Sequence, residues 1–335
     1  MTVKADVTQT AGPARPWTRV LKLVQFEEAG VLFALLLICF LLTVTTDRFA
    51  QVANIVNVLR QASYIGIMAV GMVFLLSQGD VDMSVGAMYN LVAMCMARAL
   101  VEGLPIEFII PFGLLLGALL GFVNGALSIV LDIPMIIVTL GTISVYSGLS
   151  LVVSGSTAIA NFPKDNWYFH IFSGKVFGVL PASVVIWVFV AVLGYILYSH
   201  TAFGRYICAI GANKQAARYA GININGNRLV ATTLMGVICA IGSIGVLGFL
   251  KAADPSVGKG SELMVISSAI IGGTSIFGGS GTVIGALIGA LIISVIRNGL
   301  VLLNVSVYWQ GVVTGLTIIA AVALDYVIKR RRSGR

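Results

Sequence analysis

Charged residues are scarce in this chain, and their scarcity excludes a soluble globular fold. Only 10% of the 335 residues are Asp, Glu, Lys or Arg, whereas 58% are hydrophobic and the mean hydropathy is +1.01. Proline is also rare, with 8 residues, while glycine is frequent, with 38, as is typical of closely packed membrane helices. The composition therefore predicts an all-α polytopic membrane protein.

Residues that carry catalysis or bind metals are equally few. The four cysteines lie in or beside apolar segments without paired metal-ligand spacing, and the two histidines are His170 and His200. His200 could be a metal ligand or a pH sensor, but a loop histidine beside the membrane is the simpler interpretation. The chain also has no Walker A sequence and no Gly-x-Ser-x-Gly motif. We therefore predict no catalytic residue, no metal and no cofactor bound by this chain.

The 13 acidic residues are missing from the centres of the apolar stretches. Transporters driven by protons or sodium commonly carry an ionisable group deep in the membrane. In this chain every acidic residue is predicted at the end of a span, in a loop or in the N-terminal tail. This placement disfavours secondary transport, although sodium bound by carbonyl groups would escape the test. We therefore expect the energy for transport to come from another subunit.

Ten stretches are apolar enough to span a membrane, which takes roughly 20 residues. Ten spans place both termini on one side, and 13 of the 21 Lys and Arg residues then fall in the two tails and in the segment 200–228. By the positive-inside rule, this side is cytoplasmic. The same rule explains the net charge of +8, so we do not predict that the chain binds nucleic acid. The predicted spans are 29–46, 55–78, 84–101, 108–131, 134–153, 179–199, 229–250, 262–278, 281–301 and 307–328.

The predicted organisation is thus a cytoplasmic tail over 1–28, a permease domain over 29–328 and a basic cytoplasmic tail over 329–335. The basic tail could bind anionic lipid, but a topology anchor is the simpler interpretation. The longest outer loop, 154–178, contains Trp167, Tyr168 and Phe169. We predict that these aromatic residues are interfacial anchors and that the loop is the docking surface on the outer face.

The segment 200–228, called the elbow below, is the most polar internal stretch of the chain. Asn213 is suited to cap a short helix over 214–220, and Gly221 is suited to end it. A plain membrane loop could be shorter and less structured. We therefore predict an ordered cytoplasmic elbow that contacts a partner.

Two glycine-rich stretches predict tight cytoplasmic turns. The first, over 77–86, contains Gly79 and Gly86, and Asp82 or Ser84 is expected to cap the helix that follows. The second, over 272–281, lacks the Lys-Ser/Thr of a phosphate-binding loop and is predicted to be a turn that needs glycine conformations.

An internal repeat relates the two halves of the chain. The Asp-Met-Ser-Val-Gly sequence at 82–86 recurs as Asp-Pro-Ser-Val-Gly at 254–258, and the Asn-Gly pair at Asn124 recurs at Asn298. In the predicted topology the first copies lie near the cytoplasmic side and the second copies on the outer side, which is the pattern of an inverted repeat. Because the pathway of such transporters follows the interface between repeats, Asn124 and Asn298 are pathway candidates. A hydrogen bond between helices is the alternative.

Polar residues inside the apolar spans must meet protein or water. Thr139, Thr142, Tyr146 and Ser150 recur at helical spacing on one face of the fifth span, where helix packing and pathway lining fit equally well. Asn90 in the third span is a further pathway candidate. Glycines at four-residue spacing, such as those of 117–125, predict close helix packing.

Five stretches, in this order and at these distances, resemble the ribose-type permease subunits of ABC sugar importers, over nearly the whole chain. They are NVLRQAS at 57–63, GDVDMSVG at 79–86, PMIIVTLGT at 134–142, GANKQAARYAGIN at 211–223 and the segment 262–281. Branched-chain amino acid permeases look like more distant relatives.

This resemblance implies a type II importer permease that forms a dimer with an identical chain or a paralogue in the inner membrane. It implies a cytoplasmic ATPase with two nucleotide-binding modules, which binds ATP and magnesium, and a periplasmic protein that delivers a sugar or polyol. It also implies that the elbow is the coupling helix. The residues expected to couple it to the ATPase are Gly211, Asn213, Lys214, Ala216, Ala217, Arg218 and Gly221.

Two positions depart from the family pattern. Many members have Gly-Gly-Ile-Asp where this chain has Gly79-Asp80-Val81-Asp82, so Asp80 is an additional acid, and Ala212 stands where a second glycine is common. Because of these two differences, we do not assign the substrate of any one relative to this chain. An ion-coupled transporter or channel, and a membrane sensor or scaffold, remain the alternative hypotheses.

Overall fold

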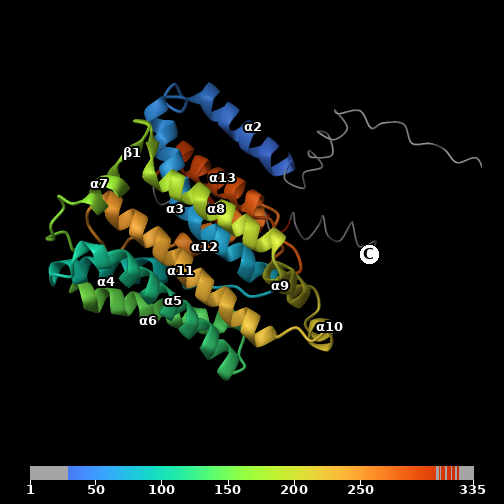
Figure 1. Cartoon of the computed structure of the whole chain (residues 1–335). Helices are drawn as coiled ribbons and strands as arrows, with labels where there is room; N and C mark the ends of the chain where they lie inside the picture. The colour runs from blue at the N-terminus through green and yellow to red at the C-terminus, as the bar shows by residue number, and fades with distance from the viewer. Residues whose placement is uncertain are drawn as a thin grey trace, which may run out of the picture.

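Nine of the ten predicted spans overlap apolar α-helices, one of them, α12, over little more than half of the predicted length (Figure 1). The computed structural model describes residues 29–306, 309, 311–313, 315–317, 319–320 and 323, so most of the tenth predicted span, 307–328, and both predicted tails lie outside the described residues. Six helices are long and apolar enough to cross a membrane: α3 (Val52–Ser77), α5 (Ile106–Val130), α6 (Met135–Ser154), α8 (Ala182–His200), α11 (Ile224–Leu250) and α13 (Val283–Leu302). Three apolar helices are shorter: α2 (Ala29–Thr45), α4 (Val85–Val101) and α12 (Ser261–Ile271).

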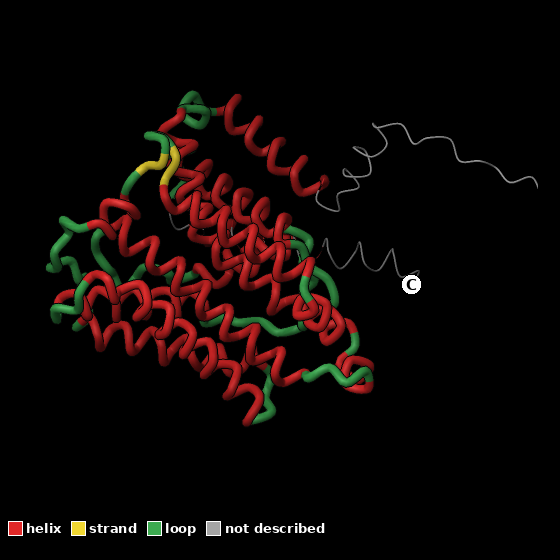
Figure 2. The backbone as a smooth tube through the Cα atoms, viewed as in Figure 1, coloured by secondary structure: helices red, strands yellow, loops and turns green. Residues whose placement is uncertain are grey.

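The bundle has two distinct ends (Figures 1 and 2). At one end, called the elbow end, lie α9 (Ala202–Ala212) and α10 (Lys214–Tyr219). At the other, called the hairpin end, lie α7 (Trp167–Ser173) and an antiparallel hairpin of β1 (Lys175–Val176) and β2 (Leu180–Pro181). The all-α prediction is therefore confirmed apart from this hairpin, which is the only sheet in the described part of the chain.

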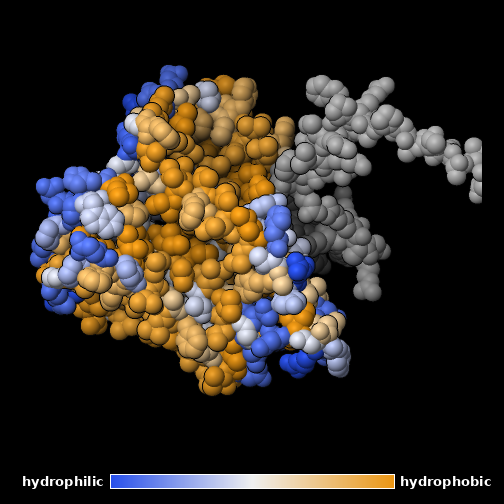
Figure 3. Space-filling view, in the orientation of Figure 1, coloured by the Kyte–Doolittle hydropathy of each residue, from blue (hydrophilic) through white to orange (hydrophobic). Residues whose placement is uncertain are grey.

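The outer surface between the two ends is hydrophobic, with hydrophilic residues gathered toward the ends (Figure 3). Large apolar side chains are exposed between the ends, including Phe33, Leu115, Val152 and Phe189, which are 62% or more exposed. Such a continuous apolar belt is stable against lipid and costly in water. Together with the six long apolar helices, it indicates a multi-pass membrane protein.

Helix α11 occupies the centre of the bundle and packs against α5, α3 and α4. Its contact with α5 depends on glycines, because a Cβ atom added at Gly236 would collide with the carbonyl of Gly117, and one added at Gly121 would collide with the carbonyl of Thr232. The predicted packing role of the glycines over 117–125 is thus confirmed. In lipid the hydrophobic effect gives little attraction between helices, so van der Waals packing of the two closely spaced backbones holds α5 and α11 together.

The aromatic residues of the outer loop are not all interfacial anchors. Tyr168 and Phe169 are fully buried, and the Tyr168 hydroxyl donates to the carbonyl of Ile244 at 2.6 Å, while Trp167 is 43% exposed. The prediction was therefore wrong for Tyr168 and Phe169. They hold α7 against the end of α11, because a buried aromatic hydroxyl needs a hydrogen-bond partner.

The segment 77–86 is not a tight turn, which corrects the sequence-based prediction. Gly79, with φ of +85°, turns the chain at the end of α3, and the residues that follow run back into the bundle before α4 begins at Val85. Asp82 and Ser84 are completely buried, and the Cys239 thiol, near the middle of α11, donates to the Val85 carbonyl at 3.7 Å. Helix α4 thus starts in the interior.

The segment 251–260 is the counterpart of this re-entrant segment. It follows α11 and leads into α12, whose 11 residues extend roughly 16 Å at 1.5 Å per residue, too short for an apolar core of about 30 Å. The prediction of a spanning helix over 262–278 was therefore wrong. The helix stops at Ile271 because the following loop contains glycines with positive φ, as predicted for the second glycine-rich turn.

A single added methyl group tests the glycine contact between α5 and α11. We expect Gly236→Ala to lower the free energy of unfolding by about 1–3 kcal/mol, because the new Cβ atom forces the two helices apart. The measurement is thermal unfolding of the purified protein in detergent. Gly148→Ala in α6 is the matched control, because no atom lies within 4 Å of its added Cβ and alanine favours a helix by up to about 1 kcal/mol. Equal stability of the two variants would contradict the packing role.

Candidate functional site at the elbow

The elbow contains two short helices: α10, which matches the helix predicted over 214–220, and α9, which was not predicted. The Asn213 side chain accepts a hydrogen bond from the N–H of Ala216 at 2.9 Å and caps α10. The helix ends at Tyr219, and Gly221 follows with φ of +79°, a conformation that L-residues rarely adopt. These local interactions make the elbow a defined surface and not a loose linker.

Five of the predicted coupling residues lie on the surface of the elbow. Those exposed to solvent are Asn213, Lys214, Ala216, Arg218 and Gly221. Tyr219, which the sequence analysis did not select, is 89% exposed beside them. An exposed tyrosine on a short basic helix is typical of a contact surface, and this is the signal that could have identified it.

The other two predicted coupling residues pack against the protein itself, so their contact with a partner stays a prediction. Ala217 is 4% exposed and packs with Ile210 and Ile224, so it fastens α10 to α9 and α11. Gly211 lies against the backbone of Ser77 and Gly279, where a Cβ atom would collide with the Ser77 carbonyl. Both residues shape the elbow instead of presenting a surface.

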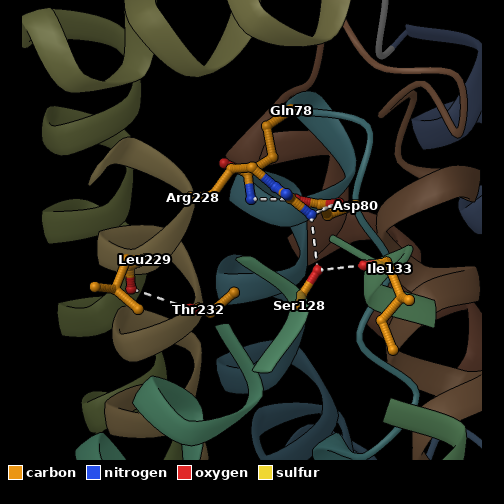
Figure 4. A network of polar contacts seen from close by, with 7 residues as sticks. All are labelled: Gln78, Asp80, Ser128, Ile133, Arg228, Leu229 and Thr232. Carbon is orange, nitrogen blue, oxygen red and sulfur yellow. Dashed lines mark hydrogen bonds and ion pairs between the residues drawn. The ribbon is translucent and has the colours of Figure 1, made fainter. Parts of the chain in front are cut away.

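An ion pair anchors the elbow to the transmembrane bundle (Figure 4). Arg228, in the second turn of α11, donates from Nε to Asp80 Oδ2 at 2.7 Å and from Nη2 to Asp80 Oδ1 at 2.9 Å. The Arg228 Nη2 group also donates to the Ser128 hydroxyl at 3.1 Å, and Gln78 donates to Asp80 at 3.0 Å. The two charged side chains are only 13% and 12% exposed. A bidentate pair with further hydrogen bonds can compensate for the loss of water around both charges.

A cavity of about 300 Å³ lies beside this ion pair, at the elbow end. It is bordered by the end of α3, the connection between α5 and α6, and the elbow. Its lining includes Asp80, Asp132, Ile210, Lys214 and Arg228. Lys214 is thus placed between the exposed face of α10 and the anchored pair.

Three pathway candidates belong to one buried polar network in the interior. Asn124 donates to Ser84 Oγ at 2.8 Å and to Asp82 Oδ2 at 3.3 Å, and its carbonyl oxygen accepts from the Tyr146 hydroxyl at 2.8 Å. The hydroxyl of Thr139 accepts from the N–H of Met83 at 3.0 Å. These bonds join α5 and α6 to the re-entrant segment 78–84, so in this conformation the polar face of α6 serves helix packing.

The remaining pathway candidates make separate contacts. Asn298 and Asn54 exchange two hydrogen bonds, at 3.0 and 2.8 Å, between α13 and α3. Asn90 donates to the carbonyl of Pro255 at 2.7 Å, and the Thr142 hydroxyl bonds only to a carbonyl of its own helix. Their role in a pathway stays a prediction.

Asp82 and Ser84 differ from the sequence-based prediction. Asp82 accepts from both the N–H and the hydroxyl of Ser84 at 2.7 Å, and Ser84 makes no side-chain cap for α4 although it occupies the N-cap position. Asp82 lies in the connection between α3 and α4, as the sequence predicts for the acidic residues, and its carboxylate is completely buried there. No Lys or Arg side chain pairs with it among the described residues.

The second copy of the repeat has the same local geometry. Asp254 Oδ1 accepts from the N–H of Ser256 at 2.7 Å and from its hydroxyl at 2.5 Å. Asp254 lies in the loop after α11, outside the helices, and the hydrogen bonds from the Ser256 hydroxyl and N–H lower the pKa of its carboxyl. A Cβ atom added at Gly86 would collide with the carbonyl of Gly258, so the two copies touch.

The two copies were expected on opposite sides of the membrane, and this placement was wrong. They touch at Gly86 and Gly258, the first copy buried and the second partly exposed. Each copy precedes a short helix: α4 leads to the hairpin end and α12 to the elbow end (Figure 1). The opposite directions of these helices are what an inverted repeat requires.

Comparison with known proteins agrees with this architecture. Residues 54–322 match the family described as "Branched-chain amino acid transport system / permease component". The chain belongs to this permease family. Together with the ribose and D-allose permease relatives described below, this match confirms the resemblance to ribose-type permeases. The relatives and the apolar helices together show that this permease is a multi-pass protein of the bacterial inner membrane and not an enzyme.

The relatives of this permease are named as permeases for different solutes. The D-allose transport system permease protein of Escherichia coli (strain K12) is 35% identical over 91% of this chain and 93% of its own length. The ribose import permease protein of Haemophilus influenzae is 35% identical over 89% and 93%, and the autoinducer 2 import system permease protein of Yersinia pseudotuberculosis is 30% identical over 91% and 87%. No solved structure matches this permease.

The buried network gives a prediction that separates packing from pathway lining. We expect Asn124→Leu to destabilise the permease by about 1–3 kcal/mol, because the Asp82 carboxylate and the Tyr146 hydroxyl lose a buried partner. Thermal unfolding in detergent is the measurement. Thr142→Val is the control, because that hydroxyl bonds only within its own helix. An Asn124→Leu protein with unchanged stability but no solute uptake would instead assign Asn124 to the pathway.

Proposed function

We propose that this permease is the membrane-spanning subunit of an ATP-driven importer that translocates a sugar or polyol delivered by a periplasmic binding protein. The support is its similarity, over about nine-tenths of the chain, to proteins named as ribose and D-allose permeases. The same relatives support a coupled system in which this chain carries no ATPase of its own. ATP and magnesium would bind to the partner ATPase.

We further propose that the elbow end faces the cytoplasm and that the elbow contacts an ATPase with two nucleotide-binding modules. The observation that supports this most directly is a basic, exposed face on α10, with Lys214, Arg218 and Tyr219, on an elbow anchored to the bundle by Arg228 and Asp80. A surface that transmits force must be both accessible and firmly attached. The proposed topology has ten spans with both termini in the cytoplasm.

The proposal includes a second permease subunit, identical or paralogous, because the ribose-type permeases that the sequence motifs resemble are expected to act as dimers. The proposed domain limits are those predicted above: tails over 1–28 and 329–335 around a permease domain over 29–328. The hairpin end would face the periplasm and receive the binding protein.

The first experiment is mild detergent extraction of the tagged permease from its native membrane, followed by mass spectrometry of the proteins that copurify. Recovery of an ATPase with two nucleotide-binding modules supports the proposal, and a second permease chain would reveal a heterodimer. Repeated recovery without any ATPase would favour the ion-coupled alternative. That alternative also predicts that uptake collapses with a protonophore while ATP is held constant.

Two substitutions in the elbow test the contact with the ATPase. We expect Arg218→Glu and Gly221→Pro to reduce solute uptake per ATP at least about tenfold without loss of membrane insertion. Glutamate reverses the charge of the exposed face, and proline fixes φ near −65°, which is incompatible with the φ of +79° at Gly221.

Uptake and ATP hydrolysis are measured together in proteoliposomes, and membrane insertion is checked by fractionation. Lys164→Glu, an exposed charge reversal at the hairpin end, is the control that should leave copurification of the ATPase intact. Normal uptake in both elbow variants would remove the elbow from the coupling mechanism.

A further inference from the structure

The geometry points to Asp80 as a positioning residue, whose ion pair with Arg228 transmits movement of the elbow to the re-entrant segment 78–84. The inference rests on the proposed function, because it concerns how an ATPase at the elbow changes the interior of the permease. Three successive contacts connect the elbow surface to the interior.

The first contact joins α10 to the start of α11. Ala217 of α10 is buried against Ile210 of α9 and Ile224 of α11. Arg228 lies one helical turn beyond Ile224, so both are on the same side of α11. Displacement of α10 by a partner therefore moves the first turns of α11 and the Arg228 guanidinium with it.

The second contact is the ion pair itself. Both oxygens of Asp80 are engaged by Arg228, at 2.7 and 2.9 Å, and Arg228 also holds the Ser128 hydroxyl at the end of α5. Figure 4 shows these side chains meeting between three elements of the bundle. Two parallel hydrogen bonds fix the orientation of the carboxylate as well as its distance, so the pair resists sliding.

The third contact is the short backbone between Asp80 and Asp82. Asp82 follows two residues later, about 7 Å away at the rise of an extended chain, with no helical turn to absorb movement. Asp82 is bonded to Ser84 at the start of α4 and to Asn124. A shift of Asp80 therefore reaches the interior point where Gly86 touches Gly258 and the two repeats meet.

The other ion pairs of the described residues lack this connection. Arg98 and Glu102 pair at 2.8 Å within four residues of one another, with side chains 52% and 62% exposed, and His170 pairs with Asp165 in the outer loop. Only the Asp80–Arg228 pair is mostly shielded from water and joins distant elements of the described chain. The exposed Arg98–Glu102 pair is consequently a matched control for the loss of a charge.

The experiment follows the interior through Cys239, whose thiol is buried against the Val85 carbonyl at the start of α4. The other three cysteines, Cys39, Cys95 and Cys208, are replaced by serine. In the complex with the ATPase, alkylation of Cys239 by N-ethylmaleimide is compared without nucleotide and with ATP and vanadate. Recovery of the complex and its rate of ATP hydrolysis are recorded for each variant.

We expect nucleotide to change the alkylation rate at least about fivefold in the otherwise unchanged protein, and Asp80→Asn to abolish that change while the complex still assembles and hydrolyses ATP. Arg228→Lys keeps the charge but loses the fork of two donors, so its response should be intermediate. Glu102→Gln should respond like the unchanged protein.

An undiminished response in both Asp80→Asn and Arg228→Lys would overturn the inference. So would failure of both variants to assemble with the ATPase, because the pair would then be an element of assembly and not of transmission. Uptake of radiolabelled D-ribose or D-allose by the unchanged complex tests the proposed function separately. Uptake together with a normal Cys239 response in Asp80→Asn would refute only the role of the ion pair.

Discussion

A polar group inside a membrane bundle must find its partner within the protein, since lipid offers none. This constraint governs the centre of the permease, where the chain leaves α3, runs back as a non-helical segment and begins α4 in the interior. Within this segment, the N–H of Met83 bonds to Thr139, the N–H of Ser84 bonds to Asp82, and the Ser84 hydroxyl accepts from Asn124. Without those partners the re-entrant path would be less stable than a continued helix or a surface turn.

The same constraint explains why the two repeats meet where they do. Each Asp-x-Ser motif satisfies its own backbone, and this local closure lets both motifs approach one another through Gly86 and Gly258. Asn90 adds a hydrogen bond from α4 to the carbonyl of Pro255 in the opposite repeat. A contact built from backbone and small residues can rearrange without breaking a large apolar core, which suits a transporter interior.

The elbow combines an exposed face with a shielded attachment. Its outward residues are free for a partner, while Ala217 and Gly211 are used to hold it against the bundle. Asp80 provides half of the ion pair that completes this attachment. Relatives of this permease have ribose, D-allose and autoinducer 2 in their names, so similarity across the family does not identify one solute.

The sequence by itself determined the membrane class, the approximate position of eight apolar helices, the capped helix at the elbow and the family. These properties depend on composition, on apolar stretches of sufficient length and on local capping, all of which are encoded within a few consecutive residues. Only the tertiary structure decided that Asp82 is buried, that the repeats touch and that Asp80 pairs with Arg228, 148 positions away. A short polar segment between apolar helices can form a surface turn or re-enter the bundle. Which of the two forms depends on whether side chains distant in the sequence, such as Asn124 and Arg228, can form hydrogen bonds with the segment.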